Sequence, residues 1–192
     1  MYRKIFNILP LLLFLGICSM GCEGRISKNE ALKKSIANFK SNQVITKIAY
    51  HPLEYNEIAT DTILSNGYEI KLKTFTDMNS SILNSSTINE ITQNHFYRIV
   101  ESKLEVKYAE NVIFRDIIGR DFIEENLQIE HKNWSKFNLR DIWIDQALSI
   151  EKNLLSIQIE FCSIESDECK KFNLLINKAG QPYITELSEN NY

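Results

Sequence analysis

The sequence predicts a mainly β protein, an antiparallel meander sheet forming a sandwich or a partly open barrel, with a short N-terminal helix. Residues 68–73 alternate strictly between apolar and charged side chains, which is the twofold period of a half-buried strand. Residues 155–176 can be paired as a hairpin whose two faces are consistently apolar and charged. No period of 20–50 residues repeats, which argues against a solenoid or propeller. An α+β fold is the alternative.

The first 21 residues have the parts of an export signal. Arg3 and Lys4 precede an apolar run over residues 5–17, and small residues follow it. The run is too short to cross a bilayer core, which needs about 20 residues. We therefore predict that residues 1–21 are a signal peptide and not a membrane span.

Cys22 follows this leader and is predicted to carry lipid. Gly21 before Cys22 resembles the bacterial lipoprotein box, although Ser19 stands where leucine is usual. Cleavage there would leave three cysteines, and lipidation of Cys22 would let Cys162 pair with Cys169 with no thiol left over. The protein would then be anchored in the cell envelope, on the outer membrane, on its periplasmic or surface side. Plain secretion is the alternative, because the small residues before Cys22 also suit an ordinary signal peptidase.

The mature chain is predicted to contain a lipid tether and short helix (residues 22–42) and one β-rich exported domain (residues 43–192). Ser27 and Glu30 have the spacing of a capping box, which predicts a helix start there. Without Arg3 and Lys4 the mature chain has 20 basic and 25 acidic residues, a net charge of −5. This balance argues against a nucleic-acid partner, which usually requires a basic patch.

The middle of the chain predicts a series of strands. A hairpin is expected around Asn66-Gly67, in a type I′ turn, because both residues tolerate positive φ. Residues 77–94 are rich in Asn, Ser and Thr and are expected to be an exposed loop or frayed crossover. Asp121 is expected to cap a short helix, and residues 139–150 suit a strand and a helix equally well. The remaining predicted strands cover residues 44–50, 58–64, 95–100, 104–108, 112–118 and 183–187.

The C-terminal hairpin is specified by two independent patterns. If Cys162 faces Cys169, apolar residues pair along one face and Glu160 meets Lys171 on the other. A register slip of one residue would break both patterns. An oxidising exterior favours a disulfide here, and closing this short loop would contribute about 2–3 kcal/mol. A metal or redox site is disfavoured because no histidine is near and the spacing is not C-x-x-C.

The sequence predicts no catalytic residue, cofactor or metal site. The three histidines, His51, His95 and His131, are far apart and are expected to be surface or strand residues. No G-x-S-x-G elbow, Walker loop or G-x-G-x-x-G motif is present. Trp134 and Trp143 are candidates to line a ligand groove, with core packing as the other explanation. Acidic residues that could serve a carboxylate-dependent hydrolase are Asp116, Asp121, Glu124, Glu125, Asp141 and Asp145.

The chain resembles a family of uncharacterised lipoproteins from Bacteroidetes. The resemblance rests on the leader with Cys22, the alternating strand at 68–73, the segment Trp134-Ser135-Lys136-Phe137 and the hairpin 157–176 with its lysine-glycine turn at 178–180. It implies export and a compact domain of unknown activity, with no catalytic residues to transfer.

These observations favour a membrane-anchored lipoprotein that is a non-enzymatic binding or structural module. Its partner would be a protein or a small molecule, in addition to the membrane. An inhibitor or immunity lipoprotein is the alternative, favoured by an acidic or polar tip on a protruding loop at 163–168 or 77–94. A carboxylate-dependent hydrolase is less favoured.

Overall fold

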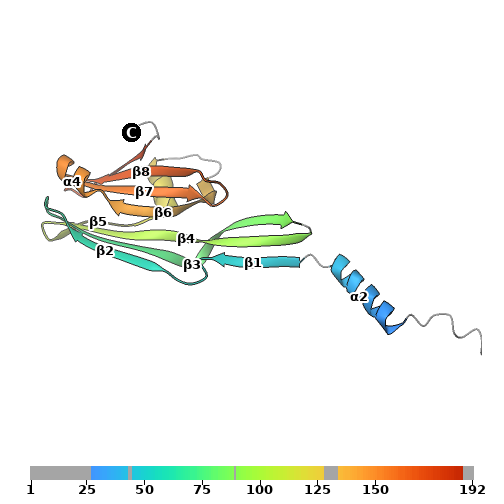
Figure 1. The fold of residues 1–192 in the computed structure, drawn as a ribbon. Helices are drawn as coiled ribbons and strands as arrows, with labels where there is room; N and C mark the ends of the chain where they lie inside the picture. The colour runs from blue at the N-terminus through green and yellow to red at the C-terminus, as the bar shows by residue number, and fades with distance from the viewer. Residues whose placement is uncertain (1–26, 43–44, 89, 128–133, 188–192) are drawn as a thin grey trace, which may run out of the picture. The chain divides into compact units, whose positions relative to one another are not determined.

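A computed structural model describes residues 27–42, 45–88, 90–127 and 134–187 (Figure 1). The chain forms two units, divided between Val44 and Ile45. The predicted leader and Cys22 lie outside the described residues. Among the residues described, no helix has the length and apolar character needed to cross a membrane.

The first unit contains helix α2 (Lys28–Asn42), and its predicted capping box is confirmed. The Glu30 backbone N–H donates to Ser27 Oγ at 3.2 Å, and the Ser27 N–H donates to Glu30 Oε2 at 3.3 Å. These reciprocal bonds satisfy two backbone donors that the helix itself cannot pair.

The second unit consists of two β-sheets, and the mainly β prediction is confirmed. One sheet has the order β1-β4-β3-β2, with β5 also paired to β4, and the other has the order β6-β7-β8-β9. All described strand pairs are antiparallel except β1 with β4. The strands are β1 (Ile45–His51), β2 (Glu57–Ile63), β3 (Tyr68–Ile88), β4 (Ile91–Tyr108), β5 (Asn111–Ile118), β6 (Phe137–Ile144), β7 (Leu155–Ser163), β8 (Cys169–Ile176) and β9 (Pro182–Leu187).

The two sheets face each other as a sandwich (Figure 1). Tyr68 on β3 is fully buried, and its hydroxyl donates across the core to the Ile176 carbonyl of β8 at 3.2 Å. At the β8–β9 turn, Gly180 has φ +79° and lies so close to β5 that a Cβ there would sit 1.9 Å from the Ile113 carbonyl oxygen. Only glycine fits such a conformation and approach.

The predicted hairpin at Asn66-Gly67 is present, but the predicted type I′ turn is wrong. Gly67 alone has positive φ, and Leu64 pairs with Tyr68 around a three-residue loop. The Asn66 side chain is used elsewhere, because its Nδ2 donates at 2.8 Å to the Ser149 carbonyl in helix α4 (Gln146–Lys152). This tertiary bond favours the longer loop, in which an αL glycine follows an ordinary turn.

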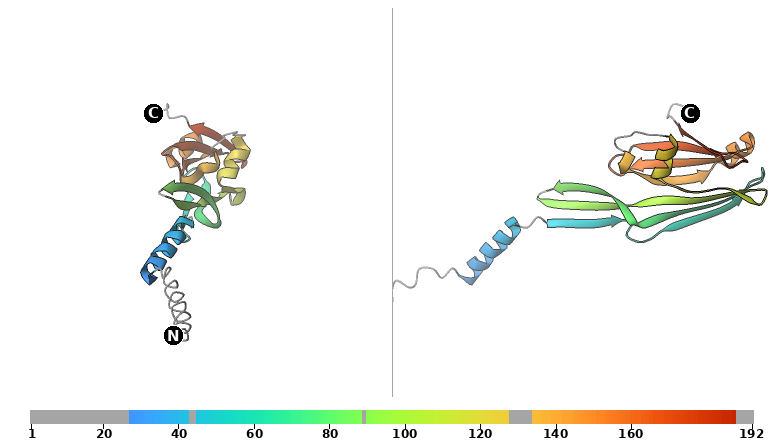
Figure 2. Two further views of the ribbon diagram at one scale, coloured as in Figure 1. Left: turned by 90° about the vertical axis from the view of Figure 1, so that its right-hand side faces the viewer. Right: turned by 180° about the vertical axis from the view of Figure 1, so that it is seen from behind.

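The prediction of a loop at residues 77–94 is also wrong. Strands β3 and β4 continue through it as a hairpin that runs past the end of the second sheet, here called the arm (Figure 2). Polar side chains pair across the arm, as between Ser85 Oγ and Asn94 Oδ1 at 2.7 Å. Where β3 bulges between Thr76 and Ser81, Arg98 donates to the Met78 carbonyl. Strand β1 pairs in parallel with β4, so the arm contains three strands. Its Asn, Ser and Thr residues are therefore ordered by backbone hydrogen bonds between strands and not by burial.

The ambiguous segment 139–150 contains both a strand and a helix. Strand β6 ends at Ile144, Asp145 caps the next helix by accepting from the Leu148 N–H at 2.9 Å, and α4 (Gln146–Lys152) follows. Helix α3 (Arg120–Leu127) begins one residue before the predicted cap Asp121. A short 3-10 turn, η2 (Trp134–Lys136), leads into β6.

Candidate functional site

The C-terminal hairpin positions the site, and its predicted register is confirmed. Cys162 pairs with Cys169, Glu160 with Lys171, and Ile159 with Phe172. The predicted disulfide is present, with an S–S distance of 2.06 Å. It closes the loop that joins β7 to β8.

A β-bulge in the neighbouring edge strand β6 places Arg140 beside this disulfide. Leu139 pairs with Phe161 and Asp141 with Glu160, so Arg140 has no partner in the ladder. Inward-facing residues shift from 137 and 139 before the bulge to 142 and 144 after it. The extra residue therefore turns Arg140 outward, and bulges often redirect a side chain in this way.

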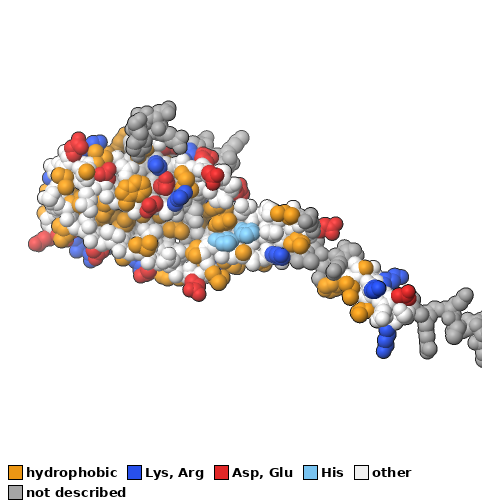
Figure 3. Space-filling model, in the orientation of Figure 1, with side chains coloured by type: hydrophobic (Ala, Val, Ile, Leu, Met, Phe, Trp, Pro, Cys, Tyr) orange, Lys and Arg blue, Asp and Glu red, His pale blue; other side chains and the backbone are white. Residues whose placement is uncertain are grey.

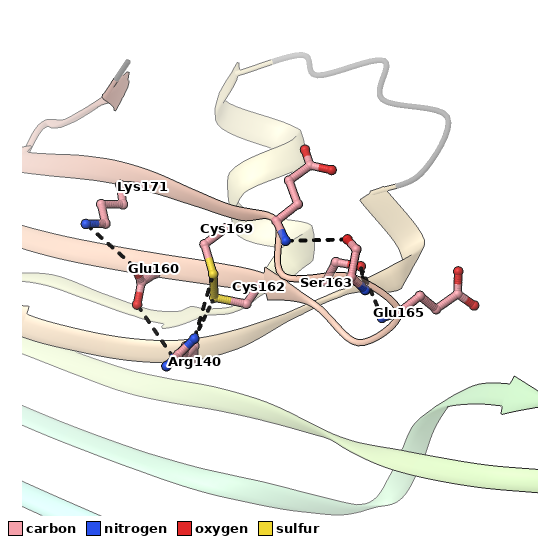
Figure 4. Close-up of a disulfide and its surroundings, with 9 residues drawn as sticks. Arg140, Glu160, Cys162, Ser163, Glu165, Cys169 and Lys171 are labelled. Atoms are coloured by element: carbon pink, nitrogen blue, oxygen red, sulfur yellow. Dashed lines mark hydrogen bonds and ion pairs between the residues drawn. A yellow bond between two sulfur atoms is a disulfide. The ribbon is translucent and has the colours of Figure 1, made fainter. Parts of the chain in front are cut away.

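The Arg140 guanidinium lies over the disulfide with only long contacts (Figure 4). Its Nη1 is 3.7 Å from Cys162 Sγ and 3.8 Å from Cys169 Sγ, and its Nε is 3.9 Å from Glu160 Oε2. Glu160 is shared, since Lys171 Nζ lies 3.8 Å from its other oxygen. Two-thirds of the Arg140 side chain is exposed, at 66%. An arginine has five N–H donors, so most of its hydrogen-bonding capacity is available to a ligand.

Arg140 borders an open cavity of about 520 Å³, which we call the Arg140 groove. It is lined by Tyr97 of β4, by residues 138–140 of β6 and by the disulfide loop. This volume lies within the range of small-molecule sites. The residues lining the groove are Tyr97, Asn138, Leu139, Arg140, Cys162, Ser163, Ile164, Glu165, Ser166 and Asp167.

Hydrogen bonds hold the walls of the Arg140 groove in place. Asn138 joins the two sheets, because its Nδ2 donates to the Arg98 carbonyl at 2.8 Å and its Oδ1 accepts from the Val100 N–H at 3.0 Å. Lys136 Nζ binds Glu165 at 2.7 Å and also donates to the Leu83 carbonyl of the arm at 3.1 Å. The groove is therefore preformed, and a ligand would lose little free energy to ordering it.

The disulfide loop is organised by Ser163. Its Oγ accepts from the backbone N–H groups of Glu165 and Ser166, each at 3.2 Å (Figure 4). Glu165, Asp167 and Glu168 are exposed on this loop. The loop thus presents acidic side chains on a short, cross-linked frame.

A second cavity, of about 270 Å³, lies on the other side of Arg140 and reaches β2 and β3. Glu57 lines it and is already paired, with Lys73 Nζ at 2.6 Å and the Tyr55 hydroxyl at 2.5 Å. The hydrogen bond from Lys73, followed by the one from Tyr55, lowers the pKa of the Glu57 carboxyl. The Glu57 carboxylate is therefore already paired within the protein. Arg140 lines both cavities and has N–H donors available to a ligand.

The two tryptophans proposed from the sequence do not lie in the Arg140 groove. Trp134 is only 1% exposed and packs in the core, where its ring is 5.2 Å from Phe137 and 5.1 Å from Phe161. Core packing is therefore the correct interpretation of Trp134. Trp143 is 41% exposed on β6, past the bulge.

The carboxylates considered for a hydrolase are dispersed over several elements. Asp145 caps α4, while Asp116 and Asp141 each accept the backbone N–H of the following residue at 2.8 Å. None of the six line the Arg140 groove or the cavity beside it. Among the described residues, the group of three potential ligand side chains within reach of one ion is Glu160 with Cys162 and Cys169, and these two sulfurs are bonded to each other.

Sequence reasoning missed Arg140 although a signal was present. In Phe-Asn-Leu-Arg-Asp-Ile-Trp-Ile the apolar alternation breaks at Arg140-Asp141 and resumes with opposite parity. Such a break inside a strand indicates a bulge. Tyr97 belongs to the aromatic residues that could line a ligand groove, but no sequence pattern places it beside Arg140, because only the packing of the two sheets brings β4 to this place.

A search against models of protein families matches nothing in this chain, and a search of curated proteins also matches nothing. The resemblance to Bacteroidetes lipoproteins stays a prediction from the sequence.

Proposed function

We propose that this chain is an exported lipoprotein, anchored through Cys22, that binds a carboxylate-bearing ligand in the Arg140 groove without catalysing a reaction. Export is supported by the leader and by the Cys162–Cys169 disulfide, since disulfides persist mainly outside the reducing cytoplasm. The ligand would be a small acid or the end of a peptide chain.

The observation that carries the binding proposal is the state of Arg140. Its guanidinium projects from a bulge into a preformed groove of about 520 Å³, and its ion-pair distance, from Nε to Glu160 Oε2, is as long as 3.9 Å. Planar guanidinium groups bind carboxylates through two parallel hydrogen bonds. Tyr97 and Ile164 add apolar surface beside the charge, which suits an organic acid better than an inorganic anion.

A library of short peptides with free carboxyl termini, compared with the same library amidated, would test this proposal. The free-acid peptides should raise the melting temperature of the protein and the amidated ones should not. Arg140→Gln should abolish the shift. Arg115→Gln is the matched control, because Arg115 is similarly exposed but is paired with Glu105 at 2.6 Å. Equal shifts from both libraries, or an unchanged response in Arg140→Gln, would count against the proposal.

An inhibitor or immunity lipoprotein is a second candidate function, supported by the disulfide loop. Its exposed carboxylates, Glu165, Asp167 and Glu168, stand on a cross-linked loop that could enter a basic site of a partner protein. A photo-reactive residue at position 166 would then cross-link to a partner protein in cells. Peptide binding in the Arg140 groove without any cross-link from position 166 would favour the first function.

A further inference from the structure

The parallel pairing of β1 with β4 brings together two histidines that are 44 residues apart. In this ladder His51 pairs with Tyr97, and Ala49 pairs with His95. The two histidines therefore lie on the same face of the sheet, on neighbouring strands, and are offset by two residues along the ladder. Their ring nitrogens, His51 Nε2 and His95 Nδ1, are 2.9 Å apart. The two ring planes are parallel within 5° and their centroids are 5.1 Å apart, so with 2.9 Å between the nitrogens these atoms face each other.

This histidine pair is accessible and held in place. The Tyr97 ring stacks on His51 with centroids 5.0 Å apart, which limits rotation of the His51 ring. His51 is exposed and His95 is half-buried. In Figure 3 the two described histidines form one pale-blue patch at the surface, where the arm begins.

The geometry points to a chelate site, and we propose that His51 and His95 together bind a divalent transition-metal ion, with Cu²⁺ bound more tightly than Zn²⁺. Imidazole nitrogens bind such ions at about 2.0 Å, so two adjacent ligands of a square-planar ion lie about 2.8 Å apart. The observed separation matches this spacing before any backbone movement. Each ring would then turn by about 45° within its own plane, a movement that stays parallel to the ring, to point its lone pair at the ion, and water would complete the coordination.

Metal binding requires one proton to move and none to be lost. In the hydrogen bond between the rings, one nitrogen carries the proton and the other accepts it. The donor ring must transfer that proton to its own second nitrogen, giving the other neutral tautomer. Both facing nitrogens are then free to coordinate the ion. The order of affinities follows the general preference of nitrogen ligands for Cu²⁺ over Zn²⁺.

Calorimetric titration with CuCl₂ and ZnCl₂, and electron paramagnetic resonance of the copper-loaded protein, would test the proposal. The full mature protein should be extracted in detergent, carry no polyhistidine tag, and have any free thiol alkylated. We expect one Cu²⁺ per chain, a copper spectrum with splitting from two nitrogens, and weaker binding of Zn²⁺. His51→Gln and His95→Gln should each weaken Cu²⁺ binding by about tenfold or more, because each removes one of two protein ligands.

His131→Gln is the matched control, since it removes the remaining histidine and should leave Cu²⁺ affinity unchanged. Circular dichroism would establish that each variant is folded, and two independent ligand variants guard against loss of folding in one. The proposal fails if wild-type protein takes up no Cu²⁺, or if affinity changes less than twofold in both ligand variants. It also fails if His131→Gln reduces binding as much as they do, and the pair would then be only a structural hydrogen bond.

Discussion

Removing the Cys162–Cys169 disulfide should lower stability by an amount that the structure allows us to calculate. The bond joins residues separated by 7 in sequence. In the chain-entropy model a closed loop of about eight residues gives about 2.5 kcal/mol at 25 °C. For a chain of this length that corresponds to a fall in melting temperature of about 5–10 °C. The double variant Cys162→Ser/Cys169→Ser should retain the fold, because the rest of the β7–β8 ladder remains paired.

Urea unfolding followed by circular dichroism, with and without dithiothreitol, measures this effect and contains its own control. Reductant should bring the wild-type curve to that of the double variant and leave the variant unchanged. Trp134 lies in the core near this hairpin, so its fluorescence should report the same transition. The reasoning is refuted if wild type and variant unfold at the same urea concentration without reductant, or if the untreated wild type titrates two additional thiols.

Three further changes test the core, the β8–β9 turn that packs against β5, and a carboxyl with a raised pKa. Trp134→Ala should cost about 3–5 kcal/mol in urea unfolding, whereas Trp143→Ala should cost about 1 kcal/mol or less, and similar values would contradict the core assignment. Gly180→Ala should cost about 2 kcal/mol or more, because the added Cβ meets the Ile113 backbone at positive φ, and a neutral effect would rule out that close approach. Burial, with two nearby aspartates, raises the pKa of Glu101. The folded state therefore holds this proton more tightly than the unfolded chain does, so Glu101 lowers stability as pH rises through its folded pKa. Glu101→Gln should be more stable than wild type at pH 7, with the difference shrinking as pH falls from the raised folded pKa to about 4, near the unfolded pKa, and staying constant below it; a pH-independent difference would contradict this assignment.

The C-terminal hairpin could be predicted because two unrelated constraints select the same register. Two cysteines that form a disulfide across a hairpin must lie opposite each other in the ladder. The apolar side chains from Leu155 to Phe161 must also lie on the same face as those from Phe172 to Ile176. Both depend on residues close in sequence, so no knowledge of strand order was needed. The same reasoning explains why the capping box at Ser27 and the hairpin at Asn66-Gly67 were located correctly.

The arm could not be predicted because its residues lack the usual strand pattern. Asn84-Ser85-Ser86-Thr87 has low strand propensity, and it is ordered by pairing with β4, which in turn pairs with β1. Parallel pairing of β1 with β4 also brings His51 to His95. A parallel neighbour that distant in sequence leaves no local signal, so the histidine pair could not be found from spacing.

The Arg140 groove was only partly accessible to sequence analysis. Its cross-linked loop was predicted, and the parity break at Arg140-Asp141 could have indicated the bulge. The opposite wall depends on how the two sheets pack, through Asn138 and the backbone of β4. Composition and periodicity contain no information on that contact.

We propose above all that this protein is exported and anchored through a lipid on Cys22. Mass spectrometry of the N-terminal peptide, from protein extracted from the cell envelope with detergent, tests it most directly. We expect a peptide that begins at Cys22 and carries acyl chains on that residue. An N-terminus that retains residues 1–21, or an unmodified Cys22 in protein recovered from the cytosol, would contradict it.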